Sequence, residues 1–270
     1  MTTVADVSAA AEALWPLTGA EAWDAPGLLS GDPTAEVSRI VLAVDAVAET
    51  VDEAVALEAQ VLLVHHPLLM RGVTTVAETT AKGALLARLI RGGCALYSAH
   101  TNADVVATGT SARLAGLLGL TDALPIVETA PGVGLGRVGA LPEPTTLGAL
   151  ARRLASILPP TATGIRVAGE FDRPIARVAV CGGAGDSLLG ESAVRSSDVY
   201  VTADLRHHPA SEAVETARVA GGPALIDVSH WASEWLWLET AADELRSALP
   251  GVEVVVSELR TDPWDFVVVQ

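Results

Sequence analysis

The sequence predicts an α/β protein built from two lobes, each with a mixed or mostly parallel sheet. Short runs of Val, Leu, Ile and Ala alternate with segments of helical length along all 270 residues, which is the pattern of parallel strands connected by helices. Hydrophobic residues make up 50% of the chain but aromatic residues only 4%, so the core consists mainly of small aliphatic side chains, as in sheets covered by helices on both faces. The length suits two lobes of about 100–150 residues each.

The first half of the chain alternates helices and strands. The predicted elements are, in order, a helix over residues 4–14, a strand over 40–45, a helix over 50–59 opened by a capping box at Thr50 and Glu53, a strand over 61–64, a helix over 80–91, a strand over 94–97 and a helix over 111–118. Residues 16–33 contain Trp and Leu among Gly, Pro and Asp, which predicts a packed loop.

Polar residues follow each of the three strands predicted in this half. Two adjacent histidines, His65 and His66, come directly after a run of four branched apolar residues, and a proline then stops the strand. Asp45 follows the preceding strand, and His100 and Asp104 follow the next one. Alone, the histidine pair equally fits one core and one loop histidine. Because parallel strands end at the same edge of a sheet, where ligands bind in such folds, the three strands together favour a ligand site.

The second half repeats the alternation. A loop carrying Pro125 and Pro131 predicts the boundary between the lobes, so that residues 1–128 form the first lobe and residues 129–270 the second. The predicted elements are strands over 135–141, 164–168, 175–181, 198–203 and 223–226, and a helix over 146–158. The glycine-rich stretch Gly182–Gly185 is interpreted first as a tight turn from strand to helix and second as an anion site.

Two more histidine-bearing segments lie in the second half. Residues 204–209, Asp-Leu-Arg-His-His-Pro, repeat the order of strand, two histidines and proline seen in the first lobe. Ser229 is the predicted N-cap of a helix that begins at His230. His230 and Glu234 are four residues apart and project from one helix face. They either reach the same metal ion or form a surface hydrogen bond.

Charge and composition restrict the class of protein. A formal net charge of −16 argues against a surface that binds nucleic acid by neutralising phosphates, and a carboxylate-lined site would attract cations. No apolar run reaches the about 20 residues of a membrane-spanning helix, and the N-terminal residues lack the pattern of a signal peptide. We therefore expect a cytoplasmic protein without a membrane segment. Cys94 and Cys181 border apolar runs and are predicted to be buried free thiols.

The ordered motifs of the chain resemble those of the NIF-three-like dinuclear metal centre proteins, also called GTP cyclohydrolase 1 type 2 homologs. The matching stretches are the loop Glu21–Leu28, the segment His65–Leu69, the segment Ser98–Asp104, the segment Asp204–His208 and the segment Asp227–Glu234. The resemblance spans nearly the whole chain. It departs from the family pattern at Ala25, where Asn is usual, and at the additional histidine His207. The length indicates the short form, without the domain that some relatives carry between the lobes.

The resemblance implies a pair of metal ions in a cleft between the two lobes. Carried over by position, the metal ligands are His65, His66, Asp104, His230 and Glu234. His100 would lie in the same pocket and His208 near it, as residues that face the substrate or support the ligands. Asp104 is the expected bridge between the ions, with Glu234 as the alternative.

The ligand types agree with such a site. Imidazole and carboxylate ligands without thiolate suit Zn, Mn, Fe, Co or Ni and do not choose among them. Two ions with open positions predict hydrolysis at a phosphorus or carbon centre. We expect a hydrolase that acts on a phosphorylated or nucleotide-like small molecule. His100 is expected either as a general acid or base or as a group that holds a ligand carboxylate.

The alternative is a protein without catalytic activity, a metal-binding or regulatory ring, because the family resemblance also implies a homo-oligomer, expected to be a hexamer. A role in GTP conversion, which the family name suggests, is not supported by any guanine-recognition motif in this sequence.

Overall fold

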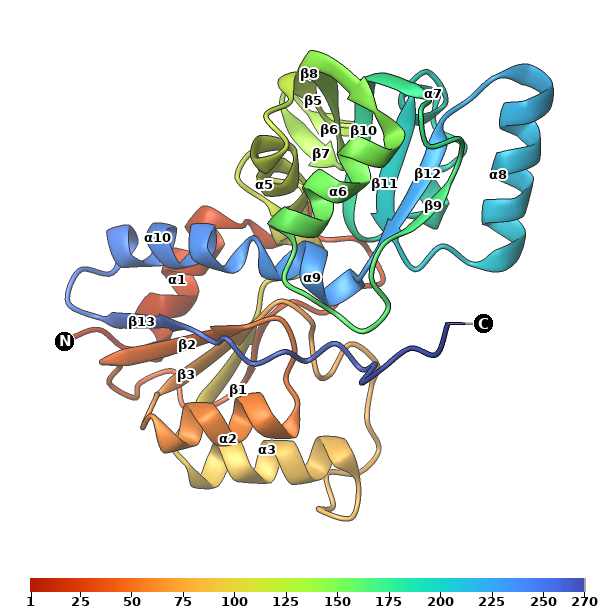
Figure 1. Ribbon diagram of the computed structural model, residues 1–270. Coiled ribbons are helices and arrows are strands. Elements are labelled where there is room, and N and C mark those ends of the chain that lie inside the picture. The colour runs from red at the N-terminus through yellow and green to blue at the C-terminus, as the bar shows by residue number, and fades with distance from the viewer. Residues whose placement is uncertain (270) are drawn as a thin grey trace. The chain divides into compact units, whose positions relative to one another are not determined.

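The chain forms two compact units in the computed structural model, which describes residues 1–269 (Figure 1). Unit 1 comprises Met1–Ala103 and Leu238–Thr261, and unit 2 comprises Asp104–Trp237 and the residues from Asp262 onward. Each unit contains a sheet with helices packed against it. The predicted α/β class is therefore confirmed.

Unit 1 is built on a five-stranded sheet in the order β1-β4-β3-β2-β13. Its elements are α1 (Val4–Leu14), a 3₁₀ turn (Leu17–Gly19), β1 (Gly27–Ser30), β2 (Arg39–Ala43), α2 (Ala48–Ala56), β3 (Val61–Val64), α3 (Ala81–Arg91), β4 (Ala95–Ser98), α10 (Leu238–Ala248) and β13 (Glu253–Val256). Strands β13, β2, β3 and β4 run parallel, and β1 pairs antiparallel with β4. The short helix α4 (Thr101–Asp104) follows β4.

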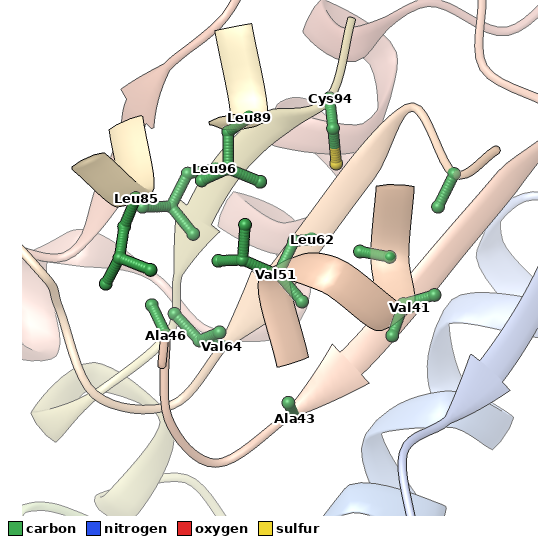
Figure 2. Close-up of a cluster of buried hydrophobic side chains, with 12 residues drawn as sticks. Val41, Ala43, Ala46, Val51, Leu62, Val64, Leu85, Leu89, Cys94 and Leu96 are labelled. Atoms are coloured by element: carbon green, nitrogen blue, oxygen red, sulfur yellow. The ribbon is translucent and has the colours of Figure 1, made fainter. Parts of the chain in front are cut away.

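The strands of unit 1 are apolar on both faces because helices cover both. All four residues of β3 and all four of β4 are buried. Figure 2 shows the cluster beneath α2 and α3, in which Leu62 of β3 lies with Val51 of α2 and Leu89 of α3. Helices α1 and α10 cover the opposite face (Figure 1). This packing fixes the parallel strands so that their carboxyl ends lie at one edge.

Unit 2 contains a six-stranded mixed sheet in the order β5-β8-β10-β11-β12-β9 and a separate hairpin, β6-β7. Its elements are α5 (Thr110–Leu117), β5 (Thr121–Leu124), β6 (Val127–Ala130), β7 (Val133–Leu135), β8 (Arg137–Thr146), α6 (Leu147–Ile157), β9 (Arg166–Ala168), β10 (Pro174–Ala184), a 3₁₀ turn (Asp186–Leu188), α7 (Ser192–Arg195), β11 (Val199–Ala203), α8 (His207–Ala220), β12 (Ala224–Val228) and α9 (His230–Trp235). Strands β10, β11 and β12 are parallel, and β9 pairs antiparallel with β12 at the sheet edge.

Three local predictions are corrected by the structure. Helix α2 begins at Ala48, so Thr50 is its third residue and not its N-cap; the Thr50 hydroxyl accepts a hydrogen bond from the Val47 amide (3.1 Å) and donates to the Asp45 carbonyl (2.7 Å). The stretch predicted as a loop before β2 contains strand β1. The glycines Gly182 and Gly183 continue strand β10 and do not form the expected turn.

The division into units also differs from the boundary expected from the sequence. The expected boundary between residues 128 and 129 lies inside the β6-β7 hairpin of unit 2. The C-terminal helix α10 and strand β13 belong to unit 1, because β13 pairs with β2. A break in composition marks a loop, but only strand pairing decides which unit a later segment joins.

None of the helices in residues 1–269 combines the length and apolar character needed to span a bilayer.

The packing of α3 predicts a difference between two neighbouring residues. Leu89 is 0% exposed in the cluster of Figure 2, whereas Ile90 is 64% exposed. We expect Leu89→Ala to lower the free energy of unfolding by about 2–5 kcal/mol and Ile90→Ala to change it by less than about 0.5 kcal/mol. Urea unfolding followed by circular dichroism measures both. Equal losses in the two variants would contradict this assignment of the buried face of α3.

Candidate metal centre

Three histidines of unit 1 follow two neighbouring parallel strands. His65 and His66 come directly after β3, and His100 comes two residues after β4. The amides of His65 and His66 donate to the carbonyls of Ala43 (3.1 Å) and Val44 (2.9 Å), which continues the β2–β3 pairing beyond the last residue of the strand. The prediction that the strand ends present these imidazoles at one edge is confirmed.

The three imidazoles form a cluster. Their ring centroids are 5.1 Å apart for His65 and His66, 5.1 Å for His65 and His100, and 5.5 Å for His66 and His100. One nitrogen of each ring lies within 4.8 Å of the corresponding nitrogens of the other two, a spacing at which the three side chains can hold a metal ion. His65 is fully buried, whereas His66 and His100 are partly exposed.

Each imidazole of this cluster has an oxygen acceptor at Nδ1. The three pairs are His65 with the Ala99 carbonyl (2.7 Å), His66 with the Asp45 carboxylate (2.7 Å) and His100 with the Asp24 carboxylate (2.8 Å). Since carbonyl and carboxylate oxygens accept hydrogen bonds, Nδ1 carries the proton in each pair. In the neutral ring, Nε2 then keeps its lone pair, which is the arrangement found in metal-binding histidines.

The Asp24 carboxylate is held from several sides. Its side chain is 0% exposed and accepts hydrogen bonds from the Thr101 hydroxyl (2.5 Å), the Thr101 amide (3.1 Å) and the Ala25 amide (2.7 Å) in addition to His100. Burial alone would raise the pKa of Asp24, but the hydrogen bonds from Thr101 and His100 outweigh it and hold the pKa below its usual value. The ionised carboxylate therefore remains an acceptor for His100.

Asp45 is held in a similar way by the C-terminal part of unit 1. Its Oδ1 accepts the Nδ1 proton of His66, and its Oδ2 accepts a short hydrogen bond from the Thr261 hydroxyl. The ring of His66 is thereby oriented by a carboxylate that is itself fixed at both oxygens.

In unit 2, helix α9 carries the second predicted pair of ligands. The Ser229 hydroxyl caps the helix by accepting from the Ala232 amide (3.2 Å), as predicted. Nε2 of His230 lies 3.0 Å from Oε1 of Glu234, which is one turn further along. Nδ1 of His230 lies 2.7 Å from Oδ2 of Asp204. Like the three histidines of unit 1, this fourth histidine thus has Nδ1 on an oxygen acceptor, which here is a carboxylate as for His66 and His100.

The surroundings of Glu234 are shaped by a glycine of β10. Glu234 is 3% exposed. A Cβ atom at Gly183, where φ is +66°, would lie 2.3 Å from Oε1 of Glu234 and 3.2 Å from Nε2 of His230, so only glycine leaves room there. Burial by itself would lower the pKa of His230, but the charges of Glu234 and Asp204 and the hydrogen bonds to them raise it to about 11. At neutral pH the His230 imidazole is therefore protonated, with Nδ1 facing Asp204 and Nε2 facing Glu234.

Asp104 and His208, the remaining predicted site residues, both lie in unit 2. Asp104 is the last residue of α4, and its Oδ1 accepts a hydrogen bond from the Thr110 hydroxyl (2.5 Å). His208 is exposed in the first turn of α8, with its ring centroid 5.2 Å from that of His207. No His or carboxylate group of the kind seen around His65 includes either histidine of α8 within the described chain.

The donor set fits a divalent cation of the borderline class. In unit 1, three imidazoles with oriented Nδ1 atoms offer nitrogen ligands, and in unit 2, His230 and the buried Glu234 offer a nitrogen and an oxygen ligand. The two cysteines are buried and free, and burial raises the pKa of each thiol to about 12. Both remain protonated at neutral pH, so neither supplies a thiolate ligand.

Sequence reasoning missed two of the carboxylates that orient the histidines, Asp24 and Asp204. Asp24 stands in the loop Glu21–Leu28, whose likeness to the family motif was visible without indicating a role. Asp204 directly follows β11 and adopts φ of +54°, a conformation that Asp tolerates better than most residues. Asp24 follows a turn and Asp204 follows a strand, and these positions were the signal that could have indicated a role. The histidines that they orient, however, are distant in the sequence.

A model of the family described as Duf34/NIF3 (NGG1p interacting factor 3) matches residues 2–263. The chain belongs to the Duf34/NIF3 family. A relative from Streptomyces coelicolor is 47% identical over alignments that cover 98% of this chain and 94% of the relative. A relative from Mycobacterium tuberculosis is 35% identical and covered to 97%, as is this chain. Both relatives are named GTP cyclohydrolase 1 type 2 homolog.

Two solved structures share the fold of this chain. A Bacillus cereus protein related to NIF3 superimposes with a TM-score of 0.90 at 22% identity, over 98% of this chain and 99% of that protein. A Staphylococcus aureus hypothetical protein gives a TM-score of 0.87 at 26% identity with the same coverage.

The alignment with the M. tuberculosis relative spans 372 positions, more than the 270 residues of this NIF3 protein, which agrees with the short form.

The carboxylate at Nδ1 of His66 predicts an effect on metal affinity. In Asp45→Asn, the amide accepts more weakly and no longer favours a proton on Nδ1, so we expect the affinity for Zn²⁺ or Mn²⁺ to fall about 10–100-fold. Asp52→Asn, at a carboxylate whose side chain is 63% exposed, is the matched control and should leave the affinity unchanged. Competition with a chromogenic chelator measures both. Equal affinities in Asp45→Asn and the control would show that Asp45 does not orient a ligand.

The raised thiol pKa values predict slow alkylation of the native NIF3 protein. Relative to an ordinary thiol of pKa 9.0, a pKa of about 12 lowers the thiolate fraction roughly a thousandfold at pH 8. We expect iodoacetamide to label Cys94 and Cys181 at least that much more slowly in the native protein than in urea, as measured by mass spectrometry. Native labelling at the rate of the unfolded chain would refute the protonated, buried state.

Proposed function

We propose that this NIF3-family protein binds two divalent metal ions per chain and uses them to hydrolyse a phosphorylated or nucleotide-like small molecule. The observation that carries the proposal is the common arrangement of four histidines, each with Nδ1 on a carboxylate or carbonyl oxygen. Histidines that serve only in packing need no such uniform orientation, whereas metal ligands almost always have it.

The proposed ligands are five side chains drawn from both units. In unit 1 they are His65 and His66, which lie in the imidazole cluster. In unit 2 they are Asp104, His230 and Glu234, of which the last two already lie 3.0 Å apart. The proposal joins these groups into one dinuclear centre, as the family resemblance implies, with a carboxylate of Asp104 or Glu234 as the bridge.

His100 has two proposed roles that its surroundings support equally. Its nitrogen lies with those of His65 and His66 at a spacing suited to a metal ion, which supports a role as an additional ligand. Its Nδ1 proton is held by the ionised Asp24, so Nε2 can accept a proton from an attacking water and the ring can return it to a leaving group. His208, exposed at the start of α8, is proposed to contact the substrate.

The reaction type follows from the donor set. Bound divalent ions of this class supply Lewis acidity and lower the pKa of water toward neutrality. The chain itself contributes oriented imidazoles and a buried carboxylate, and Asp24 and Asp45 keep those imidazoles in the tautomer that leaves Nε2 available. Sites of this kind hydrolyse bonds at phosphorus and at carbon, and the proposal takes an ester or anhydride of phosphate as the substrate class. The name of the relatives makes GTP one compound to include among those tested, and the homohexamer expected from the family remains a prediction.

Metal content tests the proposal first. Elemental analysis of the purified protein, reconstituted at neutral pH, should find about two ions per chain in the native chain and at most about half as many in Asp104→Ala. Asp172→Ala, at an exposed turn of unit 2, is the control and should retain the native content. A native protein that takes up no metal would overturn the proposed centre.

Turnover decides between a hydrolase and a protein that only binds metal. Against a panel of phosphomonoesters, phosphodiesters and nucleotides, we expect metal-dependent release of phosphate or nucleoside monophosphate that falls more than about 100-fold in His65→Ala. Two tightly bound ions without turnover on the panel would favour the alternative of a metal-binding or regulatory protein.

A further inference from the structure

A groove of about 530 Å³ lies on unit 2 between helix α6 and the segment 165–171. The α6 side is formed by one helix face, which includes Leu147, Ala151 and Ala155. The other side is formed by alternate residues, Ile165, Val167, Gly169 and Phe171. Since alternate residues of an extended chain point to the same side, this segment presents one continuous apolar face to the groove.

The groove runs along an open sheet edge. Strand β9 is the last strand of the six-stranded sheet and pairs only with β12. An edge strand has unpaired backbone groups on its outer side, and these can bind another extended chain. Val167, in the middle of β9, is 42% exposed. Both an apolar wall and a row of backbone donors and acceptors are therefore available at one place.

The segment Pro263–Val269 has the complementary properties. It contains neither helix nor strand, and Figure 1 shows it as an extended dark-blue trace. Five of its residues are large, apolar and exposed: Trp264 (61%), Phe266 (79%), Val267 (58%), Val268 (76%) and Val269 (89%). Aromatic and β-branched residues in succession favour a strand, but this segment pairs with no strand within residues 1–269.

This segment begins beside the groove without entering it. Oδ2 of Asp262 accepts a hydrogen bond from the Ser229 hydroxyl (2.6 Å), and Ser229 is one of the residues that line the groove. Oδ1 of Asp262 accepts from the Trp264 amide (3.1 Å), so the chain turns immediately after its anchor. Within one chain, the apolar segment thus begins beside the apolar groove but does not cover it. Both therefore remain exposed.

We propose that the segment 263–269 of a second copy of this chain binds in the groove, pairing its backbone with β9. Every copy carries both the segment and the groove, so exchange between two copies would cover both at once, as in other exchanges of identical elements. Trp264, Phe266 and Val268 alternate along the segment and would point to the groove together. In this register Asp265 points away from the apolar wall.

The charges support this occupant. The chain has a formal net charge of −16, yet an arginine, Arg152, lines the groove. Its guanidinium lies 5.0 Å from the centre of the Phe171 ring, which also lines the groove. Arg166 of β9 already pairs with Asp227 and does not line the groove. The incoming segment brings Asp262 and Asp265 to the groove. The aspartates of the segment in the second copy are therefore attracted to the arginine at the groove. They lie next to the apolar side chains that would bind there.

Peptide binding to the full-length chain tests the proposal. The receptor is the Phe266→Asp/Val268→Asp variant, whose own segment is disabled and whose groove is intact. A fluorescent peptide with residues 262–269 should bind it saturably, as measured by anisotropy. Adding Val167→Asp or Ala151→Trp to the receptor should weaken binding at least tenfold. Val219→Asp, at an exposed valine of α8 (87%), is the matched control and should leave binding unchanged.

Two further measurements test other parts of the proposal. One tests the backbone pairing with β9, and the other tests whether the bound segment comes from a second copy. Of two peptides that are N-methylated at Val267 or at Val268, one should lose at least tenfold in affinity, because alternate amides face the neighbouring strand. With the native chain as receptor, dilution should raise the apparent affinity of the peptide, since a second copy competes less at low concentration.

Three results would overturn the proposal. The first is that the peptide does not bind saturably to the Phe266→Asp/Val268→Asp receptor. The second is that Val167→Asp and Ala151→Trp leave its binding unchanged. The third is that its apparent affinity for the native chain does not change on dilution. The last result would assign the groove to the segment of the same chain.

Discussion

The hydrogen bond from Nδ1 to an oxygen acceptor, made by His65, His66, His100 and His230, is the interaction on which the candidate metal centre depends. It decides which nitrogen carries the proton and therefore which nitrogen can bind a cation. The acceptors must remain ionised or polar in a partly buried site, which is costly unless they are themselves hydrogen-bonded. Asp24 meets this requirement through Thr101 and Ala25, and Asp45 through Thr261. Residues that never touch an ion thus determine whether one can bind.

Parallel strand pairing explains why the histidines of unit 1 lie together. Strands β3 and β4 are neighbours in register, with Val64 opposite Ser98. The residues that follow them leave the sheet at the same edge, and helices on both faces leave this edge as the place where polar side chains can gather. The hydrogen bonds of the His65 and His66 amides to β2 extend this order beyond the strand. The imidazole cluster is therefore a direct consequence of the sheet.

Unit 2 presents its ligands by a different route. Here a short helix, capped by Ser229, places His230 and Glu234 on one face, and Gly183 of β10 leaves space beside them. The helix period determines the spacing of the pair, and Asp204 after β11 determines the orientation of the imidazole. The same Nδ1 arrangement in both units, reached through a strand end in one and a helix in the other, supports a shared chemical purpose.

The sequence by itself determined the α/β class, most of the elements and the residues that carry imidazole and carboxylate groups. Apolar periodicity, proline and glycine positions and the cap at Ser229 act over a few residues, so they can be recognised in a single chain. The start of α2, the course of β10 through Gly182 and Gly183, and the assignment of β13 to unit 1 required the tertiary structure. Those features depend on pairing between segments far apart.

The orienting carboxylates show the same limit most clearly. Asp24 is 76 positions from His100 and Asp204 is 26 positions from His230. No local pattern predicts such pairs, because a hydrogen bond between distant residues exists only once packing has brought them within about 3 Å. The amino-acid sequence therefore determined which donors the protein has and where they leave their strands and helices. Only the tertiary structure decided which oxygen each imidazole meets, and with it which nitrogen remains for a metal ion.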